Sequence, residues 1–203
     1  MDANGIHAPG YGARYSEAIR RFDQENARDP NLVVTDAVPQ PHELLYARRL
    51  TDWVLRLCPQ ASEALLLAAR CQHICRWMIP RSSYEMTRSG YLRWRNDLKR
   101  FHAKKSAEIL RELGYAEEMI ARVQDLNLKK NLGQDAECQI LEDALCLVTL
   151  QHQLADLSAK TDHDKMVSIL QKTWKKMSPV AREHAGALAY SEETKKLLEQ
   201  AIS

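Results

Sequence analysis

The sequence lacks a continuous run of roughly 18 apolar residues, the length that a membrane-spanning helix needs. Its first residues also lack the apolar core of a secretion signal. Its five cysteines, an odd number, include no CxxC pair. We therefore predict a cytoplasmic protein in a reducing compartment, with no membrane partner and with the cysteines as small buried apolar side chains. Cys71 and Cys75, four residues apart, leave open a metal ion on one helix face.

A strong charge of one sign is also absent. The 29 basic residues nearly balance the 27 acidic ones, so the net charge of +2 gives no global field that would select nucleic acid or membrane. Any anion site must be local. The length of 203 residues and the 45% hydrophobic content suffice for one sizeable core. We expect a flexible N-terminal tail over residues 1–13 and a single helical domain over residues 14–203.

Strand signals are nearly absent, whereas apolar residues recur with the 3.6-residue period of helices. The fold class we predict is therefore all-α, a single-domain multi-helix bundle. Segments 29–41 and 79–90 are expected to be loops, the first because it contains three prolines. The predicted helices cover residues 16–27, 41–58, 62–78, 91–113, 116–128, 135–160, 162–176, 179–188 and 191–202.

Several polar residues occupy helix positions that should be apolar. His73 follows Leu66 by seven residues, and His102 follows Leu98 by four. Asp143 shares a helix face with the apolar residues of its own helix, and a buried carboxylate costs several kcal/mol unless a metal, a cation or donors meet it.

These residues, together with His42, lie on four different predicted helices, as the ligands of a metal site in a helical bundle do. We predict that His42, His73, His102 and Asp143 bind a divalent metal ion such as Zn, Fe or Mn. Glu142 is the predicted catalytic acid, which would position water. The alternative is that these polar groups simply satisfy one another in the core.

A dense group of cationic and aromatic residues lies between His73 and His102. Guanidinium groups match phosphate with paired hydrogen bonds, and aromatic faces stack on bases. The predicted ligand-binding residues are Arg76, Arg81, Tyr84, Arg95 and Lys99. The alternative is a solvated helix face with tryptophans as core anchors.

The order of these motifs resembles the HD-domain superfamily of metal-dependent phosphohydrolases. The resemblance implies an HD-domain-like helical fold with His42, His73 and Asp143 as metal ligands and His102 as an additional histidine. The motif is incomplete, because Ile74 stands where that family has the aspartate of its His-Asp pair. A one-metal site and a retired pocket are both compatible with this departure.

A second resemblance covers nearly the whole chain. The runs HELLYARRLTDWV, AARCQHICRWMIPRSSYEMTRSGYLRWR, FHAKKSAEIL and LEDALCLVTL look like the domain-of-unknown-function family 4202. This match is specific, but the family carries no established activity.

Together these patterns favour a divergent HD-like protein that binds a divalent metal ion and a small phosphorylated or nucleotide-like ligand, with phosphohydrolase activity as the enzymatic form. One alternative is a non-catalytic helical module that binds a nucleotide or RNA. Another is an iron-dependent HD-type oxygenase, and a third is a helical interaction protein with a self-satisfied polar core. Whether the protein is an enzyme stays open at the level of sequence.

Overall fold

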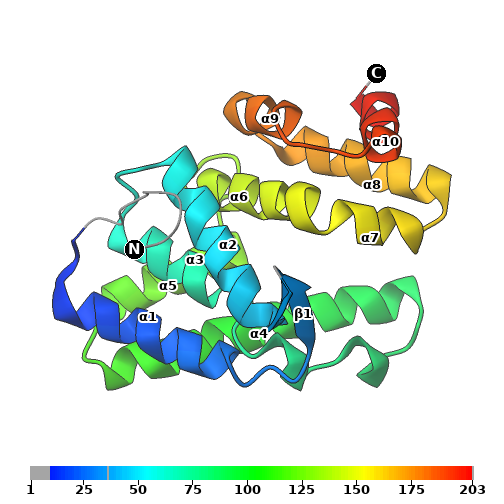
Figure 1. Cartoon of the computed structure of the whole chain (residues 1–203). Helices are drawn as coiled ribbons and strands as arrows, with labels where there is room; N and C mark the ends of the chain where they lie inside the picture. Colours follow the sequence, from blue (N-terminus) through cyan, green and yellow to red (C-terminus); the bar gives the residue numbers. More distant parts are fainter. Residues whose placement is uncertain (1–9, 36, 203) are drawn as a thin grey trace. The chain divides into compact units, whose positions relative to one another are not determined.

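A computed structural model describes residues 10–35 and 37–202 of the chain (Figure 1). These residues are mostly helical, as predicted, and also contain a small two-stranded hairpin. The chain divides into two compact units, with the boundary between Asn131 and Leu132. None of the described helices is long and apolar enough to cross a membrane. Most of the predicted N-terminal tail, residues 1–9, lies outside the described residues.

The first unit contains five α-helices, two 3-10 turns and the hairpin among its described residues. Helix α3 packs against α1, α2 and α5, and helix α4 packs against α1 and α5. Phe22, Leu50, Leu65 and Leu110 are fully buried between these helices. The elements are α1 (Gly12–Asn26), β1 (Leu32–Thr35), β2 (Val38–Pro41), α2 (His42–Leu57), α3 (Glu63–Cys71), η1 (Arg76–Met78), η2 (Arg81–Ser83), α4 (Arg88–Glu112) and α5 (Glu117–Leu128).

The hairpin corrects the prediction that residues 29–41 form only a loop. Strands β1 and β2 pair antiparallel, with Leu32 opposite Pro41 and Thr35 opposite Val38. The prolines at 39 and 41 are two residues apart, so both fall on one side of the strand and the N–H groups of the alternate residues remain for pairing. The hairpin therefore tolerates prolines that argued against a strand.

Helix α3 is shorter than the sequence predicted. It ends at Cys71 instead of running to about residue 78, and a turn over residues 72–75 follows it. Cys75 adopts the left-handed conformation (φ 54°, ψ 31°), which a continuing helix does not allow. His73 therefore lies in a turn.

The predicted loop 79–90 has a well-defined internal structure. The guanidinium of Arg81 donates to the carbonyl oxygens of Tyr84, Glu85 and Thr87. Gly90 packs so closely against the loop that a Cβ there would lie 2.2 Å from the Glu85 carbonyl oxygen. These contacts fix the path of the chain into α4.

The second unit contains α6 (Ala136–His152), α7 (Leu154–Ala159), α8 (His163–Lys176), α9 (Pro179–Gly186) and α10 (Glu192–Ile202). Helices α7, α8 and α10 pack against one another, and α6 packs against α7, α8 and α9. The single helix predicted over residues 135–160 is interrupted at Gln153, whose φ of −126° is not helical.

The cysteines are free thiols, and all except Cys58 are buried. This agrees with the prediction that they serve as small apolar side chains. Cys71 and Cys75 do not share a helix face, because only Cys71 belongs to α3. Burial raises the pKa of Cys71 to about 11 and that of Cys75 to about 12, so both thiols stay protonated at neutral pH.

We expect one thiol, Cys58, to react rapidly with Ellman's reagent in the native protein, because the other four are shielded from solvent. Unfolding in guanidinium chloride should release the remaining four. Cys58→Ser should abolish the rapid phase, and two or more rapidly reacting thiols in the native wild type would contradict the burial of these side chains.

Candidate metal centre

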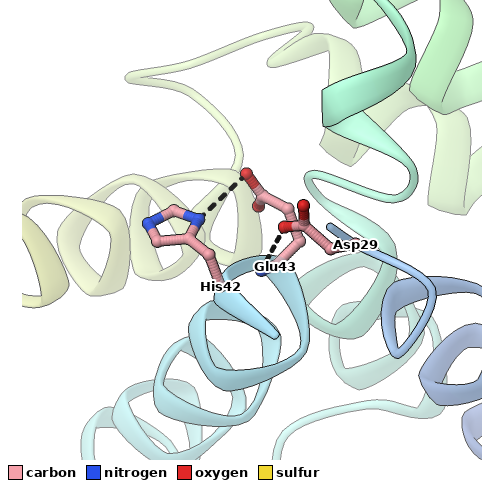
Figure 2. A group of neighbouring side chains, drawn as sticks. All are labelled: Asp29, His42 and Glu43. Carbon is pink, nitrogen blue, oxygen red and sulfur yellow. Dashed lines mark hydrogen bonds and ion pairs between the residues drawn. The ribbon is translucent and has the colours of Figure 1, made fainter. Parts of the chain in front are cut away.

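Glu43 is a buried carboxylate in the first turn of α2, and it lies at the centre of the candidate site. Asp29, in the connection after α1, fixes its position, because the backbone N–H of Glu43 donates to Asp29 Oδ2 at 3.0 Å. The other oxygen of Asp29 accepts from the backbone and side-chain N–H groups of Asn31. Asp29 thus joins the start of the hairpin to the start of α2 (Figure 2).

Three cationic or potentially cationic groups surround the Glu43 carboxylate. His42 Nδ1 lies 3.2 Å from Oε1, Arg76 Nε lies 3.8 Å from Oε1, and His73 Nδ1 lies 3.6 Å from Oε2. Burial by itself would raise the pKa of Glu43, but the two imidazoles outweigh it and lower the pKa to about 2. Glu43 is therefore ionised at neutral pH.

His102 is a buried histidine on α4 whose tautomer follows from its contacts. Its Nδ1 lies 2.7 Å from the carbonyl oxygen of Ile74, which can only accept, so Nδ1 carries the proton. Burial, and next the charge of His73, lower the pKa of His102 to about 3. The ring is neutral at neutral pH, and its Nε2 is a buried lone pair without a hydrogen-bond partner among the described residues.

The rings of these residues form a continuous series across the site. His42 stacks on Tyr46 with 6.4 Å between ring centroids, and Tyr46 stacks on His73 at 4.4 Å. His73 and His102 follow at 5.8 Å. Burial lowers the pKa of His73. The hydrogen bond between His42 and the Glu43 carboxylate raises the pKa of His42.

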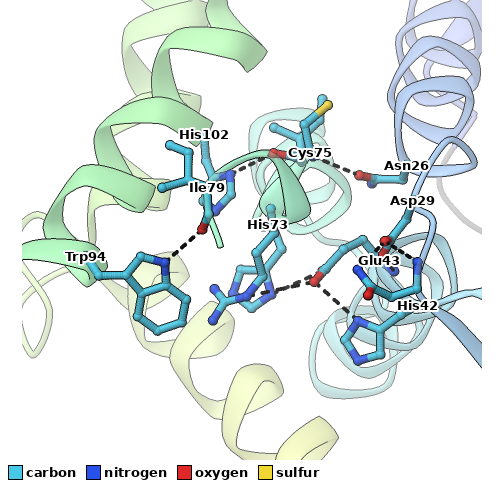
Figure 3. Close-up of polar contacts among 12 residues, drawn as sticks. Asn26, Asp29, His42, Glu43, His73, Cys75, Ile79, Trp94 and His102 are labelled. Atoms are coloured by element: carbon cyan, nitrogen blue, oxygen red, sulfur yellow. Dashed lines mark hydrogen bonds and ion pairs between the residues drawn. The ribbon is translucent and has the colours of Figure 1, made fainter. Parts of the chain in front are cut away.

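Asn26, the last residue of α1, connects the two segments that bring polar groups to Glu43. Its backbone carbonyl accepts from the N–H of Asp29 at 3.2 Å. Its buried side-chain oxygen accepts from the N–H of Cys75 at 3.2 Å. This second bond holds the left-handed turn that carries His73 (Figure 3).

The ligand atoms of Asp29, His42 and Glu43 all lie within 4.8 Å of one another, so these three residues could hold a metal ion. The donor set fits a divalent cation, because carboxylate oxygens and imidazole nitrogens are common ligands of such ions. The pairing of His102 Nδ1 with a backbone carbonyl is also the arrangement that orients a metal-binding histidine.

Of the four predicted metal ligands, His42 belongs to this three-residue group. His73 lies beside Glu43, and the His102 ring lies 5.8 Å from the His73 ring. Asp143, the fourth, lies in the second unit, where its Oδ1 accepts from Gln139 Nε2 and from the backbone N–H of Ser178, both at 2.9 Å. Its role as a ligand stays a prediction. Glu142 is buried in α6 and lies 3.6 Å from Lys176 Nζ in the same unit, and its catalytic role is likewise untested.

The predicted ligand-binding residues separate into two groups. The Arg81 guanidinium donates hydrogen bonds to backbone carbonyl oxygens, and the Tyr84 hydroxyl donates to Asp97 Oδ2 at 2.9 Å. Arg76 lies directly at the centre, and Arg95 projects from α4 beside Tyr91, 3.5 Å from its hydroxyl. Lys99 lies one turn further along α4 and is half-buried.

Sequence reasoning missed Glu43 and Asp29. Glu43 precedes Ala47 by four residues and Leu50 by seven, which is the same pattern that identified Asp143 as buried. That signal was present in the sequence. Asp29 gave no comparable signal, because it reaches the site only through the turn after α1 and the hairpin.

The chain belongs to a family of helical domains without an assigned activity. The family described as "Domain of unknown function (DUF4202)" matches residues 16–198, which spans the boundary between the two units. No curated protein matches the chain, and no protein of solved structure does.

Cys75→Gly should be more stable than Cys75→Ala by about 1 kcal/mol, because only glycine adopts the left-handed conformation without a steric cost. Both variants lose the contact of the thiol with Glu25, so their difference isolates the backbone term. Urea denaturation monitored by circular dichroism measures it. Equal stability would show that the turn carries no strain.

Asp143→Ala should lower the free energy of unfolding by about 1–3 kcal/mol, because it leaves the N–H of Ser178, at the start of α9, without its acceptor. Gln139→Ala removes the other partner and keeps the carboxylate, so its effect should be smaller. An unchanged unfolding midpoint for Asp143→Ala would contradict the structural importance of this bond.

Proposed function

We propose that the protein binds a divalent metal ion at the group formed by Asp29, His42 and Glu43, with His73 and His102 as further donors, and that it acts on a phosphorylated or nucleotide-like ligand as a divergent HD-like phosphohydrolase. The observation that carries the proposal is the buried Nε2 of His102, a neutral lone pair with no partner among the described residues. Leaving such a group unsatisfied costs about 1–3 kcal/mol, and a metal ion removes that cost.

The Glu43 carboxylate supports the proposal in a second way. Ile74 cannot ligate a metal, yet Glu43 Oε2 lies 3.6 Å from His73 Nδ1 and has no hydrogen-bond partner of its own among the described residues. The carboxylate that the HD motif would place after the histidine is thus supplied by the start of α2. A histidine and a carboxylate thus lie together although the sequence motif is incomplete, because the carboxylate comes from a different helix.

A bound divalent ion would supply a Lewis acid and a water of lowered pKa. The protein's own groups would then divide the remaining tasks. His42 orients Glu43 through Nδ1, the Ile74 carbonyl orients His102, and Arg76 presents a guanidinium to an anionic ligand. Asp143 as a further ligand and Glu142 as a water-positioning acid stay predictions from the sequence.

Elemental analysis of the purified full chain after incubation with Zn²⁺, Fe²⁺ or Mn²⁺ and removal of free metal should find about one ion per chain. Glu43→Gln, His73→Ala and His102→Ala should each weaken metal binding by at least about 10-fold, because each removes a donor. His163→Ala is the matched control, since His163 is an exposed histidine paired only with Asp164 among the described residues. Asp143→Ala tests the fourth predicted ligand.

Hydrolysis of a phosphate monoester by the metal-loaded protein should stop on addition of a chelator and return on addition of the metal. Absence of stoichiometric metal in the wild type, with equal values for the three site variants and the control, would refute the proposal. Metal binding without hydrolysis of any phosphate ester would show that the site binds metal and would refute the phosphohydrolase activity.

A further inference from the structure

Arg76 and Arg95 are two half-buried guanidinium groups of the first unit, and only Arg76 is paired with a carboxylate of the metal centre. Glu43 is one carboxylate, and it lies within 4 Å of Arg76 as well as of His42 and His73. Arg95 makes no ion pair with any carboxylate in the part of the chain that the structure describes, and its guanidinium donates a hydrogen bond of 3.5 Å to the Tyr91 hydroxyl. Arg76 thus shares Glu43 with two histidines, and Arg95 is left without a carboxylate partner among the described residues.

Arg76 lies against Trp94, and Arg95 is connected to Trp94 through Tyr91. The guanidinium of Arg76 lies over the Trp94 ring at 4.8 Å, and Arg95 is the next residue of α4. Trp94 is itself fixed, because its indole N–H donates to the carbonyl oxygen of Ile79 at 2.9 Å (Figure 3). Tyr91 packs against Trp94 with 5.8 Å between the ring centroids.

The charge of Arg95 reaches the centre. Burial is the main cause that lowers the pKa of Arg76, and the positive charge of Arg95 lowers it further. The same charge contributes to the lowered pKa of His73. Like charges held near one another in a half-buried place are unfavourable, and a bound anion converts their repulsion into attraction.

We propose that Arg76 and Arg95 bind the terminal phosphate group of the ligand, a dianionic phosphomonoester, next to the metal centre. This inference rests on the proposed function, because it assigns the anion of that same ligand. A terminal phosphate carries two negative charges and three free oxygens, which match two guanidinium groups, whereas a phosphodiester has one charge and two free oxygens.

The contacts of the other predicted ligand-binding residues decide which of them belong to the phosphate site. Arg81 binds carbonyl oxygens of its own loop and the Tyr84 hydroxyl binds Asp97, so neither is assigned to the anion. Tyr91 joins the set instead, because its hydroxyl orients Arg95 and its half-exposed ring borders the same place.

Isothermal titration of the full chain with phenyl phosphate, with and without bound metal, tests the proposal. Arg95→Gln should weaken binding at least about 10-fold, the effect of losing a charge-assisted hydrogen bond. Arg95→Lys keeps the charge but loses the paired geometry and should fall between Arg95→Gln and the wild type. Arg100→Gln removes the same charge from an exposed position of α4 and should change binding less than about 2-fold.

Diphenyl phosphate should bind at least about 10-fold more weakly than phenyl phosphate to the wild type, because its single charge pairs with one guanidinium only. Equal effects of Arg95→Gln and Arg100→Gln, or equal binding of the monoester and the diester, would overturn the assignment. Metal content separates the two proposals. Normal metal content without phosphate binding refutes only the arginine pair, whereas phosphate binding that depends on Arg95 in a chain that takes up no metal refutes only the metal centre.

Discussion

The organisation of the first unit depends on one buried charge, the ionised carboxylate of Glu43 in the first turn of α2. A charge in such a place must be met by donors or cations. The chain meets it from two directions: the turn after α3, which carries His73 and leads to Arg76, and the neighbouring His42. Asp29, in the connection after α1, holds the backbone N–H of Glu43 instead. Segments that are distant in the sequence are therefore drawn to one point by an electrostatic requirement, and the hydrophobic core of the unit packs around that point.

The turn after α3 shows what this arrangement costs. A regular helix through residue 78 would carry His73 onward along the α3 axis, whereas α3 ends at Cys71 and the turn that follows closes with the left-handed Cys75. Asn26 and His102 stabilise the turn by binding the N–H of Cys75 and the carbonyl of Ile74. Backbone strain held by buried side chains from two other helices is a feature typical of functional sites. In this protein it coincides with the histidine pair.

Much of the helical pattern could be predicted from the sequence, because amphipathic periodicity reports burial directly. The start of α3, capped by Ser62, and the end of α4 before Gly114 agree with the predicted boundaries within about two residues. The hairpin could not be predicted, because prolines argue against a strand and each strand has only four residues. Such short strands are stable only when they are paired. The sequence indicated His42 as a metal ligand, and His42 lies in the group that could hold an ion. It also indicated that His102 is buried, as the structure shows, whereas Asp29 depends on tertiary contacts that no local pattern encodes.

The support of Arg76 by Trp94 has a consequence for how a ligand would associate. Long cationic side chains normally sample many rotamers and lose that freedom on binding, at a cost of about 0.5–1.5 kcal/mol for each side chain. Here the indole ring already confines the guanidinium, and the indole N–H is itself tied to the Ile79 carbonyl before any partner arrives. An anion bound by Arg76 would therefore meet a side chain that folding has already ordered, and its association would cost less conformational entropy.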